Sequence, residues 1–276
     1  MEYVFKQTQT DNDSLRRYSS LLSAVFTETK KYTFEFLQWQ YLLNPNGTVI
    51  GFDAFYGEEL AAHYVTIPVT YEYKGELIKG LLSLNTATHP NHQGKKLFTQ
   101  LAEKTYELGK NQGYKFVIGV ANQNSTHGFI KKLGFDLIST LDVKIYFGNI
   151  KQVDVPSEMF KSHWNKAALI WRTENPSASY FRTHQSLICD THISMIKAVL
   201  SKRKECVVNE NIQPKGGFFK MEIGLNNSPS HFVLGINLPQ KLKPSPLNLI
   251  IKSLGEFNLP LTKENIFFEL IDFDAY

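Results

Sequence analysis

The chain has 276 residues, enough for one large domain or two small ones, and 42% of them are hydrophobic, as in ordinary globular proteins. The 30 basic and 26 acidic side chains leave a formal net charge of +4, too small an excess to indicate a nucleic-acid-binding protein. No signal peptide or long apolar run is present, and the two cysteines match no CxxC pattern, so we expect a cytoplasmic protein with reduced thiols, a disulfide being the alternative.

The first expected elements are two helices. Apolar residues recur at helical spacing from Leu15 to Phe26 and predict a helix over about 13–29, with Asp13 or Ser14 as its N-cap. The segment "TFEFLQWQYLLNPNG" predicts a second, shorter helix, because Asn44-Pro45 would stop it.

Alternating strands and helices follow. Runs at 49–57, 60–73 and about 77–88, separated by glycine-containing turns, predict an antiparallel meander. A helix over about 97–112, a buried central strand at 114–122 and a short helix at 125–133 come next. The segment "FDLISTLDVKIYFG" then predicts one last long strand, which would complete an α/β domain over residues 1–149.

A polar, proline-punctuated segment, "KQVDVPSEMFKSHW", predicts a domain boundary, with a second domain over residues 150–276. There "ALIWRTENP" repeats the pattern of "FLQWQYLLNP", since each reads as an apolar helix with a tryptophan and an Asn-Pro stop. A helix at "PLNLIIKSLGEF" and a final strand at "NIFFELIDF" are also expected. The repeat favours a degenerate internal duplication, although chance agreement is the alternative. Trp39, Tyr41, Trp171 and Arg172 would line a cleft between the halves; the alternative is that the two tryptophans anchor the cores.

The stretch "HPNHQGKKLF" lies between a predicted strand and a predicted helix. A helix N-terminus carries unpaired amides and positive partial charge, which favour an anion such as phosphate. Gly94 would let the backbone turn tightly, and Lys95 and Lys96 would add positive charge. The Walker and GxGxxG patterns are absent, which disfavours a nucleotide triphosphatase and a Rossmann enzyme. A plain turn remains the alternative interpretation.

The ordered set of loop, helix, buried strand and "NQNSTHGFIKKLGF" resembles the GCN5-related N-acetyltransferase (GNAT) superfamily over roughly residues 1–148. Gln93 matches the first position of the family's loop motif, whereas Lys96 and Phe98 replace its two later small residues. The resemblance implies a GNAT-like mixed sheet flanked by helices, followed by a second, degenerate GNAT-like α/β domain. The second half contains no equivalent of "HQGKKLF", as in tandem members that keep one binding-competent half.

The same resemblance implies acetyl-CoA as co-substrate and a set of contacts to it. Strand residues would offer backbone hydrogen bonds to the pantetheine arm, loop amides would bind the pyrophosphate, and two polar residues would flank the cofactor where the central strands separate. The strand residues are Thr86, Ala87 and Thr88, and the loop residues are Gln93, Gly94, Lys95, Lys96, Leu97 and Phe98. The two polar residues that would flank the cofactor are Asn124 and Ser125. For each of them a turn or helix-cap role is the alternative.

Acetyl transfer requires a neutral amine, a polarised thioester carbonyl and a protonated leaving thiolate. The tyrosine that many family members use as the acid is replaced here by Ile130. Tyr146 and His127 are candidate substitutes, and the sequence distinguishes no base among His63, Glu72 and Glu35. No metal site is expected.

The sequence therefore predicts an acyl-CoA-dependent N-acyltransferase, most simply an acetyltransferase that modifies an amine of a small molecule or peptide. It indicates no nucleic-acid or membrane partner. Two other functions stay open: a non-catalytic CoA-binding or ligand-binding protein on the same scaffold, and an aminoacyl transferase of the FemABX type that would use charged tRNA.

Overall fold

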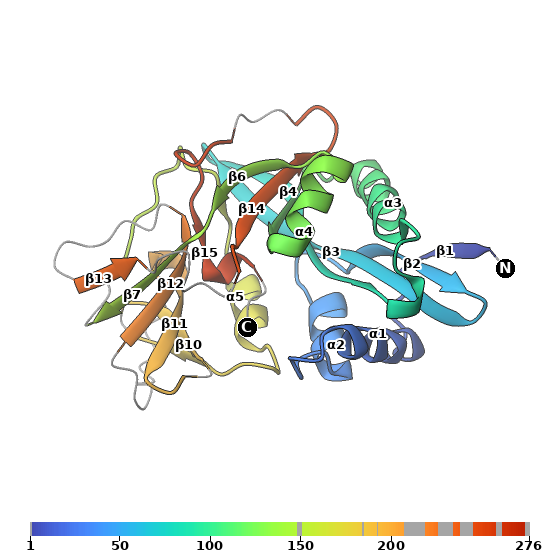
Figure 1. Ribbon diagram of the computed structural model, residues 1–276. Helices are drawn as coiled ribbons and strands as arrows, with labels where there is room; N and C mark the ends of the chain where they lie inside the picture. Colours follow the sequence, from blue (N-terminus) through green and yellow to red (C-terminus); the bar gives the residue numbers. More distant parts are fainter. Residues whose placement is uncertain are drawn as a thin grey trace.

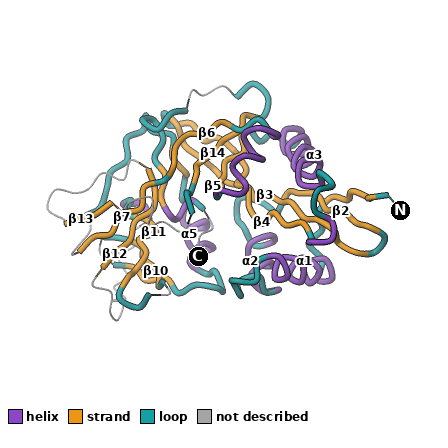
Figure 2. The backbone as a smooth tube through the Cα atoms, viewed as in Figure 1, coloured by secondary structure: helices purple, strands orange, loops and turns teal. Residues whose placement is uncertain are grey.

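The computed structural model describes residues 2–147, 151–183, 185–191, 193–206, 219–225, 234–237, 245–257 and 261–273. Two β-sheets lie side by side, and helices cover the faces of the larger one (Figure 1). Strands and helices alternate along the first half of the chain, whereas the second half is mostly strand (Figure 2). Within these ranges, no helix is long and apolar enough to span a membrane. The fold is thus mixed α/β, as the sequence predicts.

The larger sheet has, among the described residues, the strand order β1-β2-β3-β4-β5-β14-β6, with β8 paired to β3. Its β4–β5 pair is parallel and its other pairs are antiparallel. The strands are β1 Tyr3–Gln7, β2 Ile50–Tyr56, β3 Glu59–Tyr73, β4 Glu76–Thr88, β5 Phe116–Ala121, β6 Asp136–Thr140, β8 Lys161–Ser162 and β14 Asn248–Ser253. The expected meander is therefore present as β2-β3-β4, and β1 is an edge strand that the sequence analysis missed.

Helices pack on both faces of this sheet, with α1 and α2 on one face and α3 and α4 on the other (Figure 1). Their bounds are α1 Asn12–Val25, α2 Phe34–Leu42, α3 Leu97–Asn111 and α4 Gln123–His127, and a π-helical turn at Gly128–Lys132 follows α4. The N-cap of α1 is Asp11, whose carboxylate accepts hydrogen bonds from the amides of Asp13 and Ser14. The N-cap expected at Asp13 or Ser14 was wrong, because the acceptor lies just before them.

The smaller sheet has the order β13-β7-β12-β11-β10-β9 within the described ranges, with β15 paired to β12. Its strands are β7 Asp142–Phe147, β9 Tyr180–Arg182, β10 Leu187–Asp190, β11 Ile196–Ser201, β12 Phe219–Leu225, β13 Leu234–Asn237 and β15 Phe268–Glu269. Helix α5, Lys166–Thr173, lies between the two sheets (Figure 1). The expected final strand at "NIFFELIDF" is short, because a 3-10 turn at Leu270–Asp272 follows β15.

Each sheet contains a strand from the other half of the chain, and two expected elements are corrected as a result. The long strand expected at 135–148 is divided at the buried Leu141, since β6 pairs in the larger sheet and β7 in the smaller one. The helix expected at "PLNLIIKSLGEF" is instead strand β14, which lies between β5 and β6. Its apolar run Leu249, Ile250 and Ile251 is buried in the sheet, a pattern that a short buried helix segment shares.

The expected domain boundary, between residues 149 and 150, lies outside the described residues. The sheets do not follow that division, because β14 comes from the second half of the chain and completes the larger sheet. Conversely, β7 comes from the first half and pairs with β12 and β13 in the smaller sheet. The two halves therefore share one continuous structure rather than standing apart.

Trp39 of α2 and Trp171 of α5 join the two halves. Their rings stack with centroids 4.8 Å apart. Each indole N–H donates to the other residue's backbone carbonyl, at 2.7 Å from Trp39 and 2.9 Å from Trp171. Asn44 and Asn175 then close matching turns, each accepting the amide of the second residue after it. The two tryptophans are thus buried anchors at a near-symmetric join, and with Arg172 they also line a cavity of about 40 Å³ whose walls come from both halves. The repeated sequence pattern corresponds to a repeated local structure.

A buried ionic network lies in the second half, around Arg203, whose side chain is fully buried. Its guanidinium donates to Glu269 at 2.9 Å and to Asp272 at 2.7 Å, and also to the backbone carbonyl of Ser162 at 2.7 Å. The hydroxyl of Ser162 donates to Asp272 in turn. These bonds tie β8 of the larger sheet to the last described segment of the chain. Nearby, Cys206 is a buried free thiol.

Candidate functional site

The candidate site begins where two parallel strands separate. β4 and β5 pair at Leu81–Val117 and Leu82–Ile118 and diverge beyond these residues. On their outer sides, β4 pairs with β3 and β5 with β14. The strand edges that face each other across the gap therefore keep backbone groups available for an extended ligand.

A cavity of about 590 Å³ occupies this gap, which is within the usual size range of small-molecule sites. β4 contributes Ser83, Leu84, Asn85 and Thr86, and β5 contributes Gly119 and Val120; the remaining walls are Phe26, Tyr32, Phe98, Asn122, Asn124, Ser125, His127, Gly128, Phe129, Lys132 and Ile250. Strand β14 thus supplies one wall residue, Ile250, from the far end of the chain.

A second hollow, of about 220 Å³, lies at the N-terminus of α3. It is lined by Thr88, His92, Gln93, Gly94, Lys95, Lys96, Leu97, Phe98, Thr99 and Lys132. Phe98 and Lys132 line both spaces, so the hollow and the cavity adjoin at these side chains. A ligand with an anionic end and an extended arm could occupy both.

The loop backbone is shaped for close approach to a ligand. Gly94 has φ +75°, and a Cβ placed on it would meet no atom within 4 Å. Lys96, the residue before α3, is also left-handed at φ 60°. Glycine adopts this conformation without strain, whereas a lysine adopts it at a cost. The loop therefore has two left-handed residues, Gly94 and Lys96, just before α3.

The structure brings together most of the predicted cofactor residues. Thr86, Phe98, Asn124 and Ser125 line the cavity, and Thr88 and 93–98 line the hollow. Ala87 alternates with its neighbours and turns its side chain into the core, so a role for it would involve its backbone alone. Ser125 also forms a capping box with Asn122, which satisfies the first amides of α4.

The two candidate acids have different positions. His127, at the end of α4, lines the cavity and is exposed. Tyr146 lies on β7 in the smaller sheet, where it packs with Ile188 and Val199. Burial raises the pKa of Tyr146 above its ordinary value. The prediction that Tyr146 supplies the acid does not fit this placement, because the chain crosses to the other sheet at Leu141, before it reaches Tyr146.

A buried hydrogen-bond network ends at Asn85, a residue that the sequence analysis does not select. Asn85 donates from Nδ2 to Tyr41 Oη at 3.0 Å and to Gln40 Oε1 at 2.6 Å. Tyr41 Oη is 2.9 Å from His63 Nε2, and His63 Nδ1 is 2.6 Å from the carboxylate of Asp53. Because a carboxylate accepts, Nδ1 carries the proton and Tyr41 donates to Nε2.

This network holds Asn85, a wall residue of the cavity, in place. Asn85 is 8% exposed and has a left-handed backbone at φ 47°. Both of its amide hydrogens are used, so its oxygen is the polar side-chain atom left for the cavity that it lines. Complete burial raises the pKa of Tyr41 well above its usual value, so that hydroxyl keeps its proton. No local pattern signals the network, because its members lie on four separate elements, α2, β2, β3 and β4.

Comparison with known proteins agrees with this geometry. Residues 6–138 match the family model described as an acetyltransferase (GNAT) domain. This part of the chain is a GNAT domain. No curated protein matches the sequence.

Two solved GNAT-type structures resemble nearly the whole chain. One is a probable N-acyltransferase from Enterococcus faecalis V583, with 8% identity over 92% of this chain and 73% of that one and a TM-score of 0.62. Another is a GCN5-related N-acetyltransferase from Anabaena variabilis ATCC 29413, with 10% identity over 91% of this chain and 73% of that one and a TM-score of 0.61. At these identities the likeness concerns the fold, and it extends over both sheets. The two sheets fit a tandem GNAT arrangement, and the family match supports N-acyl transfer from an acyl-CoA to an amine as the class of reaction.

Proposed function

We propose that this GNAT protein transfers an acetyl group from acetyl-CoA to an amine of a small molecule. The observation that carries the proposal is the cavity between β4 and β5, which adjoins a glycine-containing hollow at the N-terminus of α3. An acyl-CoA has the matching parts, namely an anionic pyrophosphate and a long pantetheine arm that ends in a thioester.

The pyrophosphate would lie in the hollow. The backbone amides of 94–98 lie at the N-terminus of α3, a 15-residue helix, where the positive end of the helix dipole also lies. The Gln93 amide instead donates to the Pro90 carbonyl. Lys95 and Lys96 add positive charge beside the amides of 94–98, and Lys132 adds a third ammonium from the π-helical turn. The pantetheine arm would then extend along the separated strand edges, where Thr86 and Val120 line the cavity.

The reacting groups would meet near Asn85. We assign to its amide oxygen the role of accepting a hydrogen bond from the amine, since the network through Tyr41 holds that oxygen in place. His127, in the cavity wall, is the side chain we assign to protonate the leaving thiolate. The transfer breaks the thioester C–S bond and forms an amide C–N bond, and the proton released by the amine ends on the CoA thiol.

Calorimetric titration with acetyl-CoA tests the binding step. Gly94→Val should weaken binding at least about tenfold, a loss of about 1.4 kcal/mol, because a β-branched residue resists a left-handed backbone. Gly75→Val is the matched control, since Gly75 has φ +81° and equally open surroundings but lies in the distant β3–β4 turn. Failure of the wild-type protein to bind millimolar acetyl-CoA, or equal losses in both variants, would overturn the proposal.

Release of free thiol from acetyl-CoA with a panel of amines tests the chemical step. Turnover is expected, and His127→Ala should lower kcat by about 10²-fold or more while the Kd for acetyl-CoA stays the same. Binding without thiol release across the panel would instead support a CoA-binding role without catalysis. Transfer that requires charged tRNA and proceeds without CoA would support an aminoacyl transferase. The free, buried thiols of Cys189 and Cys206 are compatible with the cytoplasmic location we propose.

A further inference from the structure

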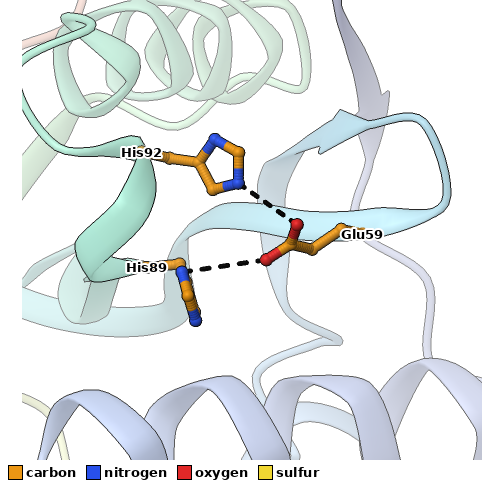
Figure 3. Close-up of side chains that lie close together, drawn as sticks. All are labelled: Glu59, His89 and His92. Atoms are coloured by element: carbon orange, nitrogen blue, oxygen red, sulfur yellow. Dashed lines mark ion pairs between the residues drawn. The ribbon is translucent and has the colours of Figure 1, made fainter.

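We propose that Glu59, His89 and His92 form a binding site for a divalent transition-metal ion such as Zn²⁺. Glu59 is the first residue of β3, and the two histidines flank Pro90 and Asn91 in the loop that leads to Gln93. One ligand atom from each lies within 4.8 Å of the other two. Figure 3 shows the His92 ring directed at the carboxylate and the His89 ring edge-on beside it, with Nδ1 as its nearer nitrogen; each histidine is paired with a different oxygen.

The distances between the candidate ligand atoms are close to those found around a bound Zn²⁺ ion. His92 Nε2 is 3.3 Å from Glu59 Oε2, and His89 Nδ1 is 3.7 Å from Glu59 Oε1. Ligands about 2.0–2.1 Å from a tetrahedral Zn²⁺ are about 3.3 Å apart. The carboxylate of Glu59 is about half exposed and can rotate, so it can close the wider separation.

His92 is held in advance in the orientation that a ligand needs. Its Nδ1 is 2.8 Å from the hydroxyl of Tyr3, and its ring lies against the rings of Tyr3 and Tyr56, with centroids at 5.7 and 5.5 Å. The ring is nearly buried, which leaves Nε2 directed at Glu59. A hydrogen bond on the opposite ring nitrogen is the usual support of a metal-binding histidine.

His89 would change its hydrogen-bond partner on binding a cation. Its Nδ1 accepts a hydrogen bond from the Asn91 amide at 3.3 Å, and the same nitrogen lies 3.7 Å from a carboxylate oxygen of Glu59. An imidazole nitrogen has one lone pair in the plane of its ring, so a metal ion would take the place of the Asn91 amide at Nδ1.

The donor set selects the kind of ion. One carboxylate and two imidazoles suit Zn²⁺ and similar ions, whereas Ca²⁺ and Mg²⁺ need more oxygen ligands. Glu59 and His89 open onto a surface hollow that also carries Arg16, Arg17 and Glu58. The two guanidinium groups oppose a purely electrostatic cation site, so the imidazole nitrogens must supply the affinity. The open side leaves a coordination position for water.

The site also lies next to the loop that the proposed function assigns to the pyrophosphate, since Gln93 follows His92 directly. A bound ion would tie that loop to the start of β3. This consequence depends on the proposed function, whereas metal binding itself does not, so the test uses the metal without CoA.

Isothermal titration with Zn²⁺, and visible absorption with Co²⁺, test the site on the full chain with any purification tag removed. We expect one ion per chain at this site, a rise in Tm on binding, and at least a tenfold weaker Kd in both Glu59→Gln and His92→Gln. Glu59→Gln alters an exposed side chain, so it reports on the site even if His92→Gln folds poorly.

The matched control is His163→Gln. His163 also faces a glutamate, with its Nδ1 3.5 Å from Glu72, but its third neighbour there is Lys161 rather than a metal ligand. This variant should bind Zn²⁺ like the wild type. No binding at millimolar Zn²⁺, or binding that Glu59→Gln leaves unchanged, would overturn the proposal.

Discussion

The two halves of the molecule each bury a polar network, and the networks differ in charge and in position. In the first half, Asp53, His63, Tyr41 and Asn85 form a chain that ends in the wall of the cavity. In the second half, Arg203 is enclosed by carboxylates and joins distant segments. The first network orients a wall residue of the candidate site, whereas the second ties distant segments of the second half to one another. Buried polar bonding thus shapes the candidate site in one half and joins strands and turns in the other.

The largest expected effect removes the charge at the centre of the second network. Arg203→Met should lower the free energy of unfolding by about 3–5 kcal/mol, because it leaves two buried carboxylates without their partner. Lys204→Met is the control, since the Lys204–Asp154 pair is exposed and should contribute about 0–1 kcal/mol. Denaturant unfolding measures both variants. Equal losses in the two would show that burial of the network does not decide its contribution.

The first network should affect both stability and function. Tyr41→Phe should cost about 1–3 kcal/mol, since it removes one hydrogen-bond partner each from Asn85 Nδ2 and His63 Nε2 in a buried site. It should also lower kcat/KM for the amine while acetyl-CoA binding persists. Tyr71→Phe is the matched control, because Tyr71 is equally buried but its hydroxyl has no hydrogen-bond partner in the described part of the chain. A loss of activity in Tyr71→Phe comparable to that in Tyr41→Phe would remove the distinction between the networks.

A smaller effect is expected in the loop that only the first half possesses. Lys96→Gly should raise the free energy of unfolding by about 0–1 kcal/mol. A left-handed backbone costs an L-residue about 1–2 kcal/mol, and the greater freedom of glycine in the unfolded chain offsets part of that gain. Lys95→Gly should be destabilising, because Lys95 is outside the positive-φ region. Thermal unfolding compares them, and a loss in Lys96→Gly equal to that in Lys95→Gly would contradict the argument.

The smallest effect at neutral pH concerns the thiols, both of which lie in the second half. Burial raises the pKa of Cys189 and Cys206 to about 12, from an ordinary value of 9.0. A raised folded pKa means that their contribution to stability is complete below about pH 9 and is lost as pH rises toward 12. Near pH 8 a thiol reagent should therefore react when the chain unfolds. Rapid labelling of the native protein would contradict this expectation, because it would show that the two thiols are accessible before the second half unfolds.

Local chemistry in the sequence predicted the parts that depend on neighbouring residues. The α1 and α3 periodicities, the meander and the loop around Gly94 follow from spacing and turn residues, and the GNAT resemblance rested on that loop. The same reasoning missed β14 and the break at Leu141. The apolar run of β14 fits a helix or a strand equally well. The alternation of side chains continues through Leu141, so the sequence gives no signal that the strand is divided there.

The sequence by itself thus determined the GNAT resemblance, the loop around Gly94 and fewer than half of the residues that line the cavity and the hollow. The tertiary structure alone decided which strand edge β14 completes, that Tyr146 belongs to the other sheet, and that Glu59 meets His89 and His92. The physical reason is that motif chemistry is local to a few residues. Strand pairing and side-chain clusters depend instead on which distant edges and faces remain to be buried when the chain folds.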